Sequence, residues 1–221
     1  MYGAILGDII GSPFEFDRGD KTKEFDLFSK GCGFTDDSVM TIAVGEALLA
    51  VGTEATVKKI EETVVTIMQD WGKRYPYAGY GGRFRHWLRE SNPKPYGSYG
   101  NGSAMRVSAA GWLYDSMERT REVARATANV THNHPEGIKG AVIIAVCTHL
   151  LINGFDKDDI LNYACKYYSD EDILSPTLTL DEYEKIRKRI STIYSVTCMH
   201  TVPLAIRCFY ESYNYEDCIT K

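Results

Sequence analysis

The amino-acid sequence predicts an all-α fold in a single domain that spans residues 1–221. Apolar residues recur at intervals of three and four along several segments, which is the spacing of one helix face. No stretch reads as a β-hairpin, and no strand–helix–strand unit or internal repeat is evident. With 221 residues, 44% of them hydrophobic, the chain is long enough to enclose a sizeable core.

The N-terminal half contains three predicted helices. The first carries Gly3, Gly7 and Gly11 at four-residue spacing, so one face is bare and another backbone can approach it closely. The second runs from Val39 to Ala50. The third begins near Val57, where apolar residues at 57, 60, 64, 67 and 71 form one stripe over about five turns.

The C-terminal half contains a central helix and several peripheral segments. Ala141–Leu151 is apolar on nearly all sides, which predicts a buried helix. Amphipathic spacing predicts two further helices, within residues 160–167 and 183–193. The stretches 75–82 and 92–102 are rich in Gly, Pro and aromatic residues and predict loops. The second is long for a loop inside a compact domain, and such loops are more often functional than idle.

The last predicted helix is short. Asn214 is a good N-cap, and Glu216 and Asp217 suit the first helical turn. The chain then ends at Lys221. A capped helix that stops after one turn predicts a truncated form of a longer sequence.

Composition argues against several classes of partner. Net charge is −5, from 25 basic and 30 acidic residues without a block of like charge, so neither nucleic acid nor an anionic membrane is an expected partner. Six cysteines without a Cys-x-x-Cys pair predict free thiols in a reducing compartment. The N-terminus lacks the features of a secretory signal, and Ala141–Ile152 is too short to cross a bilayer. We therefore expect a cytoplasmic protein.

An acidic pair stands at the start of the second predicted helix, in the sequence Thr35-Asp36-Asp37-Ser38. One interpretation is a helix cap followed by two carboxylates at the positive end of the helix dipole. The other is a cluster of hard oxygen ligands suited to Mg²⁺ or Mn²⁺, which needs further ligands from elsewhere in the chain.

Two other segments combine small and polar residues at helix boundaries. Gly100–Arg106 runs from a loop into a helix, so its backbone amides can face a phosphate, although a plain turn capped by Ser103 has the same pattern. His132 and His134 suggest a metal site only where strands present both rings, and no such strands are expected. Two alternatives remain. His132 donates a hydrogen bond to a phosphate or ribose, or the segment is a polar cluster at a helix junction.

Glu15 lies between Phe14 and Phe16, after a Ser-Pro turn. Partial burial between aromatic rings would raise its pKa toward the range of a general base. An ordinary loop carboxylate that points to water is the alternative.

Taken together and in order, these segments resemble the ADP-ribosylglycohydrolase family of helical enzymes. The resemblance covers nearly the whole chain. It rests on six stretches, which are Gly3–Glu15, Phe34–Thr41, Ala78–Gly81, Gly100–Arg106, Thr131–Gly137 and Thr201–Pro203.

The resemblance implies an orthogonal helical bundle and a set of site residues. Thr35, Asp36 and Asp37 would hold a Mg²⁺ centre, with Mn²⁺ as a substitute, and Glu15 would orient or deprotonate the attacking water. ADP-ribose would lie in a cradle with His132 at its diphosphate. The implied cradle residues are Gly100, Asn101, Gly102, Ser103 and Met105.

The sequence departs from the family pattern at its C-terminal end. Family members continue into a Gly-Gly-Asp-x-Asp-Thr segment that supplies the other metal ligands, whereas here Gly81-Gly82 precedes Arg83, and Asp170–Asp172 lacks the glycines. Two hypotheses follow. The chain is a magnesium-dependent hydrolase of an ADP-ribosylated protein or other acceptor, completed by another chain or a homo-oligomer. Alternatively, it is a weakly active or inactive module that binds ADP-ribose.

Overall fold

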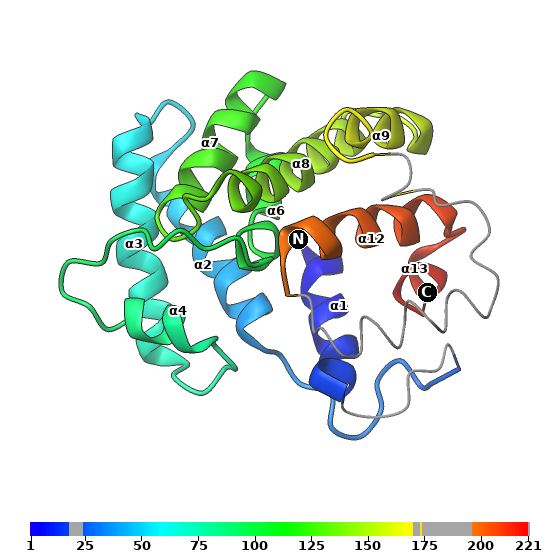
Figure 1. Ribbon diagram of the computed structural model, residues 1–221, viewed down its shortest axis with the longest axis horizontal. Coiled ribbons are helices and arrows are strands. Elements are labelled where there is room, and N and C mark those ends of the chain that lie inside the picture. The colour runs from blue at the N-terminus through cyan, green and yellow to red at the C-terminus, as the bar shows by residue number, and fades with distance from the viewer. Residues whose placement is uncertain (18–23, 170–172, 174–195, 221) are drawn as a thin grey trace.

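The computed structural model describes residues 1–17, 24–169, 173 and 196–220. Within these residues every regular element is helical, and the only β-type pairing is an isolated antiparallel bridge between Gly100 and Thr197 (Figure 1). The all-α prediction is confirmed. The helix predicted within residues 183–193 lies outside the described residues.

The helices follow one another along the chain. They are α1 (Tyr2–Gly11), the 3-10 turn η1 (Ser12–Asp17), α2 (Asp36–Val51), α3 (Val57–Arg74), α4 (Gly82–Trp87), α5 (Gly102–Met105), α6 (Ser108–Leu113), α7 (Met117–Asn129), α8 (Pro135–Ile152), α9 (Lys157–Ala164), α12 (Cys198–Glu211) and α13 (Tyr215–Thr220). Longer connections lie between η1 and α2 and between α4 and α5.

The core forms around α8. This helix packs against α5, α6, α7, α9 and α12, and α2 and α3 complete the opposite side of the bundle (Figure 1). Among the described helices α8 alone is long and apolar enough to cross a bilayer, yet 56% of that span is buried inside the protein. It is the central buried helix that the apolar run predicts.

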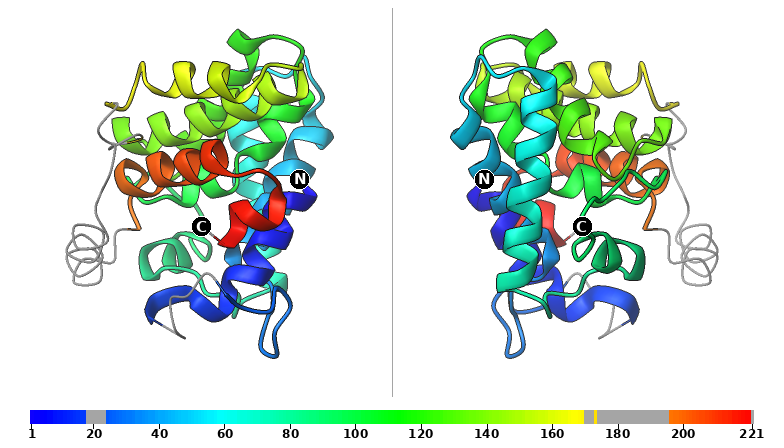
Figure 2. Two further views of the ribbon diagram at one scale, coloured as in Figure 1. Left: turned by 90° about the vertical axis from the view of Figure 1, so that its right-hand side faces the viewer. Right: turned by 90° about the vertical axis from the view of Figure 1, so that its left-hand side faces the viewer.

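The glycine face of α1 is covered by α13, which brings the two ends of the chain together (Figure 2). The contact is made by side chains, not by a backbone as the glycine spacing predicted. The Tyr215 hydroxyl donates a hydrogen bond to the carbonyl of Gly3 at 2.6 Å, and the Ile219 side chain lies over Gly7. Large side chains fill the groove that glycines leave, so this part of the prediction is wrong in its detail.

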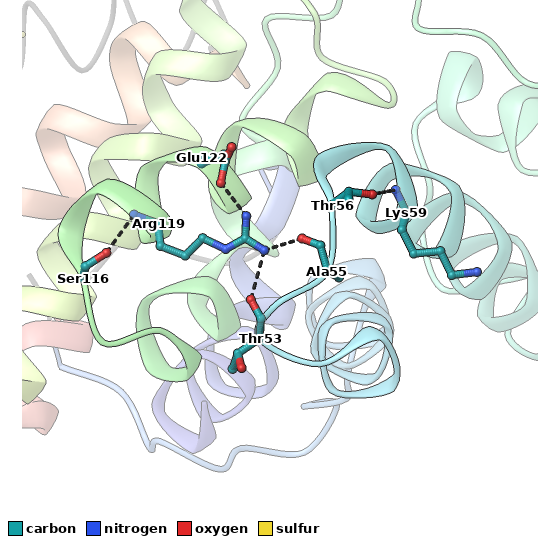
Figure 3. A network of polar contacts seen from close by, with 7 residues as sticks. All are labelled: Thr53, Ala55, Thr56, Lys59, Ser116, Arg119 and Glu122. Carbon is teal, nitrogen blue, oxygen red and sulfur yellow. Dashed lines mark hydrogen bonds and ion pairs between the residues drawn. The ribbon is translucent and has the colours of Figure 1, made fainter.

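A network of polar contacts near the surface joins the start of α7 to the loop between α2 and α3 (Figure 3). The Arg119 guanidinium donates hydrogen bonds to the carbonyls of Thr53 and Ala55 and pairs with Glu122. Thr56 and Ser116 cap α3 and α7 by accepting from backbone amides. The bonds of Arg119 connect α7 to the loop that leads into α3, and α3 and α7 pack against each other.

The expectation that the cysteines do not form a disulfide framework is confirmed, whereas the reducing compartment stays a prediction. None of the six cysteines is joined in a disulfide, and Cys147 and Cys198 are buried. Burial raises the pKa of the Cys147 thiol to about 12, so it packs as a small apolar side chain.

Candidate functional site

The N-terminus of α2 is held against α1 by Asp8. The Asp8 carboxylate accepts hydrogen bonds from the amides of Thr35 and Ser38, at 2.8 and 3.0 Å, and from the Thr35 hydroxyl at 2.6 Å. The first amides of a helix have no acceptor within the helix, and a negative charge is favourable at this end. Asp8 therefore fixes the start of α2 and, with it, Asp36 and Asp37.

Thr35 is the N-cap of α2. Its hydroxyl oxygen accepts from the amide of Asp37 at 3.3 Å while its hydrogen goes to Asp8. The capping interpretation of the Thr-Asp-Asp sequence is thus confirmed. Because a hydroxyl oxygen has two lone pairs, one of them remains available to a cation.

Three carboxylates converge beside this junction. One oxygen from each of Asp8, Glu15 and Asp37 lies within 4.8 Å of the other two. The residues come from three consecutive elements, namely α1, η1 and the first turn of α2. Carboxylate oxygens are the preferred ligands of Mg²⁺ and Mn²⁺, and three such charges repel one another unless a cation lies between them. This carboxylate cluster therefore fits a hard divalent cation.

Asp36 has a different neighbour. Its Oδ1 lies 3.3 Å from the position that a Cβ atom would take at Gly79, in the loop between α3 and α4. Gly79 has a φ of 104°, in the left-handed region that favours glycine. A side chain at Gly79 would press on Asp36. Of the two adjacent aspartates, Asp37 joins the carboxylate cluster and Asp36 faces the loop.

The surroundings make both aspartates costly to ionise. Desolvation, followed by repulsion from Glu15 and Asp8, raises the pKa of Asp36 to about 6. Desolvation and the neighbouring Asp36 and Asp8 raise the pKa of Asp37 to about 7. A cation bound at the cluster would offset both effects, because it stabilises the ionised form.

The Gly100–Met105 segment forms a tight turn, and some of its backbone amides already donate hydrogen bonds within the protein. The amide of Gly100 donates to the Ser98 hydroxyl at 3.2 Å, and that of Asn101 donates to the carbonyl of Val196 at 2.7 Å. In the described part of the chain, no acceptor takes the amide hydrogens of Gly102 and Ser103. Ser103 is fully buried, so among the described cradle residues the amide of Gly102 is the one left to meet a ligand. The short α5 gives it little help from a helix dipole.

Ser103 does not present its hydroxyl to a ligand. The side chain is fully buried, and its hydroxyl donates to the carbonyl of Gly137 at 2.7 Å. This bond ties α5 to α8. The capping interpretation of Ser103 is also wrong, because the N-cap of α5 is Asn101, which makes no side-chain capping bond.

His132 and His134 have different surroundings: His132 faces the glycine turn, and His134 caps α8. They do not form a metal site together. The Nε2 atom of His132 lies 3.4 and 3.6 Å from the positions that Cβ atoms would take at Gly102 and Gly100. His134 is instead the N-cap of α8, where its Nδ1 accepts from the amide of Glu136 at 3.2 Å. At both glycines a side chain would come into contact with the His132 ring, which is itself buried. The donor interpretation of His132 is compatible with this position.

One helix links the carboxylate cluster to the glycine turn. Thr41, one turn beyond the acidic pair on α2, donates its hydroxyl hydrogen to the carbonyl of Met105 at 3.2 Å. Because α2 carries Asp37 at its N-terminus and Thr41 further along, the two halves of the site have a fixed spacing. The candidate site consists of the carboxylate cluster and of the glycine turn that faces His132.

Sequence reasoning missed Asp8 as a site residue. It is the only charged residue in the glycine-rich α1, and a single carboxylate in an otherwise uncharged helix was the available signal. Its partners are 27 and 30 residues away in the sequence. No local pattern identifies contacts of that kind.

The whole chain, residues 1–221, matches the family model described as ADP-ribosylglycohydrolase. The chain belongs to this family. The human ADP-ribosylhydrolase ARH3 is 32% identical over 183 residues, which are 70% of this chain and 49% of that protein. The ADP-ribosyl-[dinitrogen reductase] glycohydrolase of Rhodospirillum rubrum is 29% identical, over 69% of this chain and 56% of that protein.

A solved structure shares the fold of this ADP-ribosylglycohydrolase family chain. It is titled "ADP-ribosylglycohydrolase-related protein complex" and superimposes with a TM-score of 0.65 at 18% identity, covering 99% of this chain and 76% of the other. The helical architecture is thus that of the family. The chain spans about half the length of the curated relatives it matches.

Proposed function

We propose that this chain hydrolyses, with Mg²⁺ as cofactor, the glycosidic bond between ADP-ribose and a protein side chain or another acceptor. The observation that carries the proposal is the fixed spacing, along α2, between the Asp8–Glu15–Asp37 carboxylate cluster and the turn that faces His132. The relatives named ADP-ribosylhydrolases support the same reaction.

The chemistry requires charge control at the ribose C1″ atom, where positive charge develops as the glycosidic bond breaks. Bound Mg²⁺, or Mn²⁺ in its place, would supply the positive charge that grips ribose hydroxyls and polarises a water molecule. In this proposal Asp37 and Thr35 would hold the cation at the carboxylate cluster, and Asp36 would join them from its place beside Gly79. Asp8 fixes the start of their helix. Glu15 takes the proton of the attacking water.

The other end of the substrate lies against the glycine turn. The amide of Gly102 and the ring of His132 would bind the diphosphate, and the buried Ser103 would hold the turn in place through its bond to Gly137. Gly100, Asn101 and Met105 would line the same space. Several donors placed before the substrate arrives supply both affinity and orientation.

The carboxylate cluster also supports a second candidate, a module that binds ADP-ribose with weak or no turnover. Both oxygens of Asp8 already accept hydrogen bonds from α2, so this member of the cluster is committed to the fold. Mg²⁺ with few charged ligands keeps most of its water and binds weakly. A second copy or another chain that adds ligands would restore activity, and we place this assembly in the cytoplasm.

Calorimetric titration with ADP-ribose, with and without Mg²⁺, separates the candidates. We expect binding that strengthens with Mg²⁺, accompanied by release of ADP-ribose from a modified protein. Binding that is indifferent to Mg²⁺ and occurs without release would support the module. If ADP-ribose does not bind under either condition, both candidates are wrong.

The raised pKa values of Asp36 and Asp37 predict how stability depends on pH. Because the folded protein holds these protons more tightly than the unfolded chain, the contribution of the two aspartates to metal-free stability is greatest at low pH. It falls as the pH rises through about 6 to 7. Mg²⁺ competes with protons for the same oxygens, so its effect on Tm should be larger at about pH 8 than at about pH 5. Thermal unfolding with and without Mg²⁺ measures this, and an equal Mg²⁺ effect at both pH values would contradict it.

A further inference from the structure

A fully buried arginine lies behind the glycine turn. Arg106 is 1% exposed and stands immediately after α5. Its Nη2 donates hydrogen bonds to the Thr131 hydroxyl at 2.8 Å and to the carbonyl of Thr127 at 3.2 Å, and its guanidinium lies over the ring of Phe84. It forms no ion pair with any carboxylate in the described part of the chain. The buried guanidinium therefore fixes the orientation of the Thr131 hydroxyl and the Thr127 carbonyl, which accept its hydrogen bonds.

Thr131 transmits that orientation to His132. The Thr131 side chain is fully buried, and its Oγ1 lies 2.8 Å from Nη2 of Arg106 and 2.6 Å from Nδ1 of His132. A guanidinium only donates hydrogen bonds, so it occupies a lone pair of the hydroxyl oxygen. Within the described residues the hydroxyl hydrogen then has one acceptor in reach, which is Nδ1.

The tautomer of His132 follows from this arrangement. If Nδ1 accepts a hydrogen bond, it carries no hydrogen, and the hydrogen of a neutral imidazole must be on Nε2. The opposite tautomer would leave the buried Thr131 hydroxyl hydrogen without an acceptor, which disfavours it by roughly 10- to 100-fold. Desolvation and the charge of Arg106 lower the pKa of His132 to about 2, so the ring stays neutral.

We propose that Arg106 is a positioning residue that acts through Thr131 to hold His132 as the Nε2–H tautomer. His132 then donates a hydrogen bond to an oxygen atom of a phosphate or ribose bound at Gly100 and Gly102. This assignment deepens the proposed function and rests on it for the identity of the ligand. In this tautomer Nε2 favours an oxygen acceptor over a metal cation, because a nitrogen atom that carries a hydrogen has no lone pair to offer a metal.

The tautomer itself is measured in the ligand-free protein. Long-range ¹H–¹⁵N correlation spectra of the imidazole rings at about pH 7 should show His132 protonated at Nε2 and unprotonated at Nδ1. The spectrum of His132→Gln assigns the signal among the five histidines. An Nδ1–H tautomer or an imidazolium ion in the wild-type protein would overturn the proposal.

A pair of matched variants tests the role of Thr131. Thr131→Val keeps the shape of the side chain and removes the hydroxyl, whereas Thr131→Ser keeps the hydroxyl. We expect the valine variant to lose the uniform Nε2–H tautomer and to bind ADP-ribose roughly 10- to 100-fold more weakly. The serine variant should retain both properties. A valine variant with the wild-type tautomer and affinity would overturn the relay.

The failure of this inference can be distinguished from the failure of the proposed function. If the wild-type protein does not bind ADP-ribose but shows His132 as Nε2–H, the relay stands and the ligand is wrong. If it binds ADP-ribose with the ring in the other form, the function stands and the relay is wrong. Should the valine variant not fold, the wild-type spectrum still decides the tautomer.

Discussion

Replacing Asp37 with Asn is expected to stabilise the metal-free protein and to abolish its response to Mg²⁺. The Asp37 carboxylate is desolvated and close to three other carboxylates, so its pKa is raised to about 7. An amide of the same shape removes the repulsion, which should raise the free energy of unfolding by about 1 to 3 kcal/mol at pH 8. The same change removes a charged oxygen ligand. Mg²⁺ affinity should therefore fall by at least about 100-fold.

The substitution is thus expected to raise the stability of the metal-free protein and to lower its affinity for Mg²⁺. A simple loss of folding would not give this combination. Thermal unfolding with and without Mg²⁺ gives both values for one variant. Asp115→Asn is a matched control, because Asp115 is an exposed aspartate in the connection between α6 and α7. An Asp37→Asn protein that still gains stability from Mg²⁺, as the wild type does, would remove the metal role assigned to the carboxylate cluster.

Replacing Glu15 with Gln is expected to lower turnover by about 100- to 10,000-fold, the range of general acid–base catalysis. In the proposed reaction Glu15 accepts a proton from the attacking water, which an amide does not do. Its position among the converging carboxylates places it next to the cation that would hold the ribose. ADP-ribose affinity should change by less than about threefold, since the loss concerns the transition state.

The release of ADP-ribose from a modified protein measures turnover, and calorimetry measures affinity. Glu54→Gln, an exposed residue in the loop between α2 and α3, serves as the control. If Glu15→Gln and wild type turn over at the same rate, Glu15 is not the base. A loss of Mg²⁺ affinity equal to that of Asp37→Asn would reassign Glu15 as a metal ligand.

Local sequence patterns predicted much of the helical framework. The stripe that begins at Val57 became α3, where Ile60 and Val64 are buried and Ile67 and Trp71 are partly buried. The apolar run at 141–151 became the core helix α8. These predictions depend only on the spacing of apolar residues along a helix of fixed pitch. The N-caps Thr35 and Asn214 were predictable for the same reason, because a cap bonds to amides two or three residues away.

Contacts between distant segments were not predictable in this way. The glycine face of α1 predicted a close neighbour, but not that Tyr215 and Ile219 would fill it. The glycine turn predicted a cradle of amides, yet those of Gly100 and Asn101 are used within the fold. Sequence spacing shows which groups can bond, whereas the packed chain decides which of them are already satisfied.

The sequence by itself determined the helical class, the family and the residues from which a site could be built. Tertiary structure decided which of them meet. It added Asp8 to Glu15 and Asp37, turned Asp36 toward Gly79, and buried the Ser103 hydroxyl against α8. The physical reason is that helix formation depends on neighbours a few residues apart. The charge and hydrogen bonding of a site instead depend on groups that only folding brings together.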